Sequence, residues 1–282
     1  MAINIQTNVS SLNAQRNLTT TISSMQTALS RLSSGYRITR ASDDAAGLAI
    51  SESLRAQIRS TSQAQRNAYD GISVVQTAEG SLNEVSNILI RMRELTMQAA
   101  SDSVGTTERG YLQVEFSALQ AEIDRIANST EFNGRKLING SLSLESEGLT
   151  FQIGIHNVTA NDRVSITLAC TDSEALGVNS GFVSINTRSL AQTALSKIDV
   201  ALQNVSSIRA KMGALENRLN STIANLSNSF ENLSAANARI RDMDVAAETS
   251  ALTKSQILLQ AGASVLAQAN AVPQVALALI GR

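Results

Sequence analysis

The chain is poor in residues that interrupt helices and in residues that build many catalytic sites. Its 282 residues include 1 Pro, 0 Trp, 1 Cys and 1 His, and only 3% are aromatic. Scarce proline permits very long helices, and scarce aromatic side chains leave a core of Ala, Leu, Ile and Val. A single cysteine excludes an intramolecular disulfide, and a single histidine excludes the two-histidine motif of zinc metalloproteases. We therefore expect no enzymatic activity, no metal and no cofactor.

Cys170 and His156 leave one nucleophilic pair arithmetically possible. Both residues lie in a short strand-like region that contains no nucleophile motif. A small buried thiol and a surface imidazole are the favoured interpretation of the two residues.

Charge and hydropathy exclude further classes of protein. The 23 basic and 24 acidic residues are interspersed and give a net charge of −1, so nothing favours nucleic acid or an acidic membrane surface as a partner. The N-terminus lacks the basic and apolar regions of a secretory signal. Residues 255–281 carry no charge and are long enough to cross a bilayer, but they include several Gln, Asn and Ser residues. We interpret this segment as an intermolecular packing surface and expect no membrane span.

Apolar residues recur at heptad spacing through most of the chain. They predict long helices over about 43–100, 107–128 and 189–240, with a further helix at each end of the chain. The polar residues of the two terminal helices are mostly uncharged, so their faces can be buried against other copies without stranding a charge. The terminal apolar stripes that we expect to drive assembly are Leu18, Ile22, Met25, Leu29 and Leu32, and Val245, Leu252, Leu259 and Leu266.

The apolar period changes to two between the second and third of the long helices. Alternating apolar residues from Phe151 to Ile155 and from Val164 to Leu168 flank Asn161-Asp162, which predicts a β-hairpin. The fold class expected is therefore mainly α: a long antiparallel helical rod or coiled coil with a small β-hairpin region at about 137–186. An ordinary soluble helical bundle is an alternative that the periodicity alone leaves open.

Six long blocks follow one another along the chain: NVSSLNAQRNL (8–18), RLSSGYRITRASDDAAGLAIS (31–51), RMRELTMQAA (91–100), EIDRIANSTEFNGRKLING (122–140), MGALENRLNSTIANLSNSFENLSAANARIRDMDVAAE (212–248) and ASVLAQANAVPQ (263–274). Together these blocks resemble bacterial flagellin, the subunit of the flagellar filament. The resemblance implies a short flagellin without large outer domains. In such a chain, 1–42 and 241–282 would pair as the coiled-coil inner tube, and 43–240 would form the outer helical rod with the hairpin region.

The resemblance also implies the partners and the location of the chain. It would be a homopolymer in an extracellular filament, secreted by the flagellar type III export apparatus with an export chaperone. It would meet the filament cap and the hook-filament junction proteins. One alternative is that the chain is itself a hook-filament junction protein. A signalling coiled coil is a further alternative, which would normally need a membrane span and more charged helix faces.

A cluster of helix breakers separates the N-terminal helix from the first long one. We expect residues 33–42 to connect the two domains, with Gly35 closing one helix in the left-handed conformation and Ser42 capping the next. Asp43 and Asp44 would then lie in the first turn, where the helix dipole favours negative charge. Neighbouring subunits would supply the rigidity of this connector. Candidates for bridging it to the returning chain are Arg40, Asp43, Arg241 and Asp244.

The resemblance extends to one surface of the outer helices. Four residues match positions that help to form the surface read by the Toll-like receptor for flagellin. Ordinary contacts between rods are a compatible alternative for the same positions. The four residues are Arg91, Leu95, Gln98 and Glu115.

Overall fold

The computed structural model describes residues 7–142 and 148–280, without the side chains of 272–280. The chain forms two compact units: residues up to Ile58 together with those from Asn232 onward, called here the terminal unit, and Arg59–Glu231, called here the outer unit. The predicted mainly helical fold is confirmed. The helices are α1 (Val9–Ser34), α2 (Ala45–Ala99), α3 (Thr106–Ser129), the short α4 (Thr159–Asp162), α5 (Arg188–Arg241) and α6 (Val245–Ile280).

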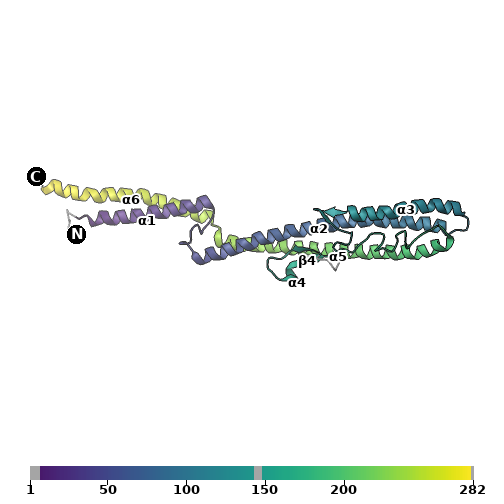
Figure 1. The fold of residues 1–282 in the computed structure, drawn as a ribbon. Coiled ribbons are helices and arrows are strands. Elements are labelled where there is room, and N and C mark those ends of the chain that lie inside the picture. Colours follow the sequence, from purple (N-terminus) through teal and green to yellow (C-terminus); the bar gives the residue numbers. More distant parts are fainter. Residues whose placement is uncertain (1–6, 143–147, 281–282) are drawn as a thin grey trace. The chain divides into compact units, whose positions relative to one another are not determined.

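In the outer unit, α2, α3 and α5 lie side by side (Figure 1). α2 and α5 are antiparallel, because Gln76 donates to Glu216 at 2.8 Å while Arg93 pairs with Asp199 at 2.7 Å. Aliphatic residues dominate the core between the helices, and Phe116 is its one large buried aromatic side chain among the described residues. The heptad residues Val205, Met212 and Leu219 of α5 are all buried there.

Two small antiparallel hairpins pack against these helices. The predicted hairpin is confirmed as β3 (Leu149–Gln152) paired with β4 (Arg163–Ile166), with Leu149 opposite Ile166. The helical turn α4 precedes β4, where the sequence favoured a simple turn at Asn161-Asp162. The other hairpin joins β1 (Glu131–Phe132) to β2 (Arg135–Lys136). Its turn residues Asn133 and Gly134 have φ of 50° and 75°, which is why an Asn-Gly pair suits this position.

The lone cysteine lies beside these hairpins and is half-buried. Burial raises the pKa of the Cys170 thiol above its usual range, which keeps it protonated and unreactive at neutral pH. A Cβ added to Gly140 would lie 3.1 Å from the sulfur. Cys170 therefore behaves as a small packed side chain.

In the terminal unit, α1 and α6 run antiparallel along each other, with the start of α1 and the last turns of α6 at the same end of the pair (Figure 1). The Asn8 side chain donates to the Ala269 carbonyl at 2.7 Å, and Arg31 lies 3.9 Å from Glu248 at the opposite end. Midway, a Cβ on Gly262 would lie 2.6 Å from Leu18 Cδ1. A glycine at this point allows the two helices to approach closely.

Candidate assembly site

Some residues of the predicted terminal stripes lie in the seam between α1 and α6, and others are exposed to solvent. Most of their residues are half-buried along the α1/α6 pair, as expected for the seam between two antiparallel helices. Leu29 and Val245 remain exposed. That any of these residues contacts a second copy stays a prediction. The half-buried members are Leu18, Ile22, Met25, Leu32, Leu252, Leu259 and Leu266.

A second apolar surface on α6 lies beside the predicted terminal stripe, and its Leu258 and Val265 are also seven residues apart. Ile257, Leu258 and Val265, called here the α6 outer face, remain exposed in the single chain. Ile257 is 61% exposed and Val265 is 59% exposed. The signal in the sequence is that α6 has apolar residues on more than one side, which is typical of a helix that becomes buried on more than one side.

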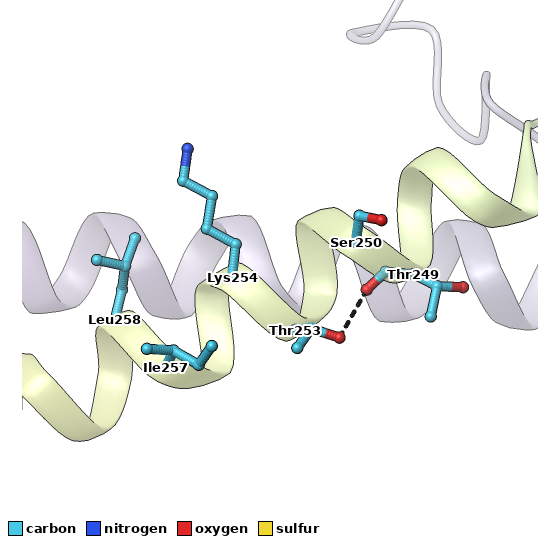
Figure 2. Close-up of a pocket in the computed structure, with 6 residues that line it drawn as sticks. All are labelled: Thr249, Ser250, Thr253, Lys254, Ile257 and Leu258. Carbon is cyan, nitrogen blue, oxygen red and sulfur yellow. Dashed lines mark hydrogen bonds between the residues drawn. The ribbon is translucent and has the colours of Figure 1, made fainter.

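A shallow groove runs along α6 beside these residues. Thr249, Ser250, Thr253 and Lys254 line it together with Ile257 and Leu258 (Figure 2). The hydroxyl of Thr253 donates to the Thr249 carbonyl at 2.9 Å, and Ser250 bonds to Ala246 in the same way. On α1 the same bond, to the carbonyl four residues earlier, is made by Thr19, Thr20, Thr21, Ser24 and Thr27.

These bonds decide what it costs to cover the terminal helices. A buried hydroxyl without a partner is unfavourable, but a hydroxyl that already bonds to its own helix retains that bond when water leaves. The Ser and Thr faces of α1 and α6 can therefore be covered at low polar cost. Burial of the apolar side chains among them supplies the favourable free energy of the contact.

The connector between α1 and α2 has the expected glycine and an unexpected cap. Gly35 adopts φ 75° and its N–H donates to the Arg31 carbonyl at 2.8 Å, which confirms the predicted left-handed close of α1. The prediction that Ser42 caps α2 is wrong. α2 begins at Ala45, and Asp44 is the cap, because its Oδ1 accepts from the Gly47 N–H at 2.8 Å.

Asp43 folds back onto the connector itself. One oxygen, Oδ2, accepts bonds from the backbone N–H groups of Thr39 and Arg40 and from the Thr39 hydroxyl, each at 3.0 Å. These bonds, that from Arg40 first, lower the pKa of Asp43. Asp43 therefore stabilises the turn before α2 rather than the first turn of the helix.

Arg241 joins the connector to the returning chain. The Arg37 N–H donates to the Arg241 carbonyl at 2.7 Å, and the Arg241 guanidinium lies 4.5 Å from the ring centre of Tyr36. The same guanidinium bonds Glu52 of α2 at 2.7 Å and thereby lowers the pKa of that carboxyl. Of the four predicted bridging residues, Arg241 makes the link, while Asp43 and Asp244 bond to backbone amides nearby. Contacts inside one chain thus hold the connector. That neighbouring subunits add to its rigidity stays a prediction.

The predicted receptor surface is only partly available. Arg91 and Glu115 are exposed, and the guanidinium of Arg91 donates to the Glu115 carboxylate at 2.8 Å. This hydrogen bond raises the pKa of Arg91. Gln98 is also exposed. Leu95 is 1% exposed within the core of the outer unit, so its place on a contact surface is a wrong prediction.

Comparisons with known proteins point to one family from near the start of the chain to near its end. Two family models match, "Bacterial flagellin N-terminal helical region" over residues 5–143 and "Bacterial flagellin C-terminal helical region" over residues 195–280. The flagellin of Halalkalibacterium halodurans is 43% identical over 276 residues, which cover 98% of this chain and 99% of that protein. The flagellin of Bacillus subtilis is 43% identical over 304 residues, with the same coverage. The "Flagellar filament 33 kDa core protein" of Treponema phagedenis is 40% identical over 286 residues, covering 98% of this chain and 99% of the relative.

Proposed function

Because the chain belongs to the bacterial flagellin family and is a subunit of the flagellar filament, we propose that the terminal helices drive its assembly through the α6 outer face. The observation that carries this proposal is the exposure of Ile257, Leu258 and Val265 beside hydroxyls that are already bonded within the helix. Contact with a second copy would cover these residues. A contact between two different surfaces repeats from copy to copy, and it builds a helical filament when its rotation does not close into a ring.

The domain roles follow from the same proposal. Residues 1–42 and 241–282 would form the inner tube, and 43–240 the surrounding outer domain with the hairpin region at about 137–186. Flagellin is a structural protein family, and we assign this chain no catalytic role. No described helix is both long and apolar enough to cross a membrane. Export through the flagellar type III apparatus with a chaperone, and contacts with the filament cap and junction proteins, belong to the proposal.

The hook-filament junction alternative gains no support. The relatives that match nearly the whole chain at 40–43% identity are flagellins and a filament core protein. Both family models that match the chain describe bacterial flagellin.

The proposal is tested by placing a charge on the α6 outer face. Ile257→Asp should abolish polymerisation in a sedimentation assay with filament seeds, because burying an unpaired carboxylate is strongly unfavourable. Val158→Asp is the control, since Val158 is also apolar and, at 48%, also exposed, but it lies in the loop that follows β3. Circular dichroism would verify that both variants keep the outer helices. Normal filaments from Ile257→Asp would refute the proposed role of this face.

A second proposed role is recognition by the Toll-like receptor for flagellin. The exposed pair Arg91 and Glu115, with Gln98 on the same helix as Arg91, supports it. Monomeric protein should activate receptor reporter cells, and Arg91→Ala should weaken the response. No response at saturating monomer would reject this role.

A further inference from the structure

A single cation lies in the groove of α6, on a helix that otherwise carries almost no charge. After Glu248, Lys254 is the only charged residue of α6. Lys254 is exposed, and its side chain extends from the helix next to Leu258 (Figure 2). Within the described residues no carboxylate lies within ion-pair distance of its ammonium group. If a second copy covers Ile257 and Leu258, this ammonium group loses water and needs an acidic partner.

The terminal unit has few carboxylates that could serve, and most are already used. Asp44 and Asp244 accept from backbone amides at the starts of α2 and α6, and Asp43 accepts from the connector. The remaining two paired carboxylates are those of Glu52, with Arg241, and Glu248, with Arg31.

Asp242 is the exception among the acidic residues of this unit. It lies between α5 and α6, where its backbone bridges to Tyr36, and it is exposed. No hydrogen bond or ion pair of its carboxylate occurs among the described residues. A free carboxylate and a free ammonium group are thus carried by the same repeating unit. Their separation of twelve residues, most of it along the helix α6, keeps them apart within one chain.

We infer that Lys254 of one copy pairs with Asp242 of a neighbouring copy and that this ion pair fixes the register in which the α6 outer face is covered. The inference rests on the proposed function and names the contact that makes it specific. Apolar contacts alone are not directional, whereas a charged pair penalises every register that leaves the ammonium group buried without a partner. Lys254 and Asp242 are therefore positioning residues for assembly.

Charge reversal in the full-length chain tests the pairing. Lys254→Glu and Asp242→Lys should each raise the critical concentration for polymerisation at least tenfold at low salt, since each places like charges together. The double variant, which carries both changes, should return to within about threefold of the original chain. Lys254→Met, which removes the charge but keeps an unbranched apolar chain, should have a smaller effect than Lys254→Glu.

Mixing the two single variants distinguishes a pair between copies from a pair within one chain. In an equimolar mixture, Glu at 254 of one variant can meet Lys at 242 of the other, and the unchanged Lys254 can meet the unchanged Asp242. Co-polymerisation of two variants that fail alone is therefore expected only for pairing between copies. Two failures separate the claims. If Ile257→Asp blocks assembly but Lys254→Glu has no effect, or neither the mixture nor the double variant recovers, the pairing is wrong and the proposed assembly face stands. If Ile257→Asp also polymerises normally, the proposed function itself fails.

Discussion

Truncating one residue of the α6 outer face gives a quantitative test of what that face contributes. Ile257→Ala removes most of an exposed apolar side chain and adds no charge. Alanine is the better helix former, so the substitution should not weaken α6 itself. Any loss of polymer would then come from the contact between copies.

The size of the effect follows from the exposure of the side chain. Fully burying an isoleucine side chain contributes about 1.5–3 kcal/mol. Ile257 is 61% exposed in the single chain, so assembly can bury about three fifths of it. That corresponds to about 1–2 kcal/mol for each added subunit, or roughly a 5- to 30-fold rise in critical concentration.

The assay is sedimentation of polymer over a series of subunit concentrations, with the unpolymerised fraction read at the plateau. Val158→Ala serves as the control, because it truncates an exposed apolar residue in the loop after β3. Its critical concentration should match that of the original chain. If Ile257→Ala and Val158→Ala shift the critical concentration equally, burial of the α6 outer face is not what drives assembly.

Three further predictions concern the connector and the core. Gly35→Ala meets no steric clash but places a Cβ in the left-handed region, so it should destabilise the connector by about 1–2 kcal/mol. The critical concentration for polymerisation should therefore rise, and an unchanged value would contradict the role of Gly35 in closing α1. Leu95→Ala should lower the free energy of unfolding of the outer unit by about 2–5 kcal/mol in urea, and a loss below about 1 kcal/mol would show that Leu95 is not a core residue. The lowered pKa of Asp43 means that the unfolded connector binds more protons in acid. Its stabilisation is therefore complete above the ordinary aspartate pKa of about 3.9 and is lost as the pH falls through the lowered value. Exchange protection of the Thr39 and Arg40 amides in filaments, corrected for intrinsic rates, should disappear over that range, and Asp43→Asn should abolish this pH dependence.

The long helices were predictable because their pattern repeats many times. The expected ranges of 43–100, 107–128 and 189–240 differ by one or two residues at each end from α2, α3 and α5. Six apolar residues seven apart in α5 allow little freedom in choosing the buried face, namely Val205, Met212, Leu219, Leu226, Leu233 and Ile240. The β3/β4 hairpin was predictable from its alternation of apolar and polar residues, since Val164 and Ile166 are buried and Ser165 is exposed.

The sequence did not predict which of several similar neighbouring residues caps a helix. Ser42, Asp43 and Asp44 are all good capping residues, and the path of the connector decides which one reaches the first free amides of α2. Asp44 does so, because Asp43 is already bonded to Thr39 and Arg40. That path depends on contacts with Arg241, about 200 residues away in sequence.

The sequence also cannot say what covers an apolar stripe. Leu259 and Ile257 differ by two positions on one helix, yet the first is half-buried in the single chain and the second is exposed. Leu95 shows the same ambiguity in the outer unit, where resemblance placed it on the surface and packing places it in the core. Only the position of the neighbouring helix distinguishes these cases.

The hydroxyls that bond back to their own helices have a consequence for temperature. Thr19, Thr253 and their neighbours keep the same donor bonds whether a face is wet or dry, so these bonds add little enthalpy when that face is covered. The free energy must come mainly from releasing water around Ile257, Leu258 and Val265, which is an entropic gain near room temperature. Contacts of this kind weaken as water is cooled. A filament joined through such faces would therefore lose subunits in the cold more readily than one joined by polar bonds.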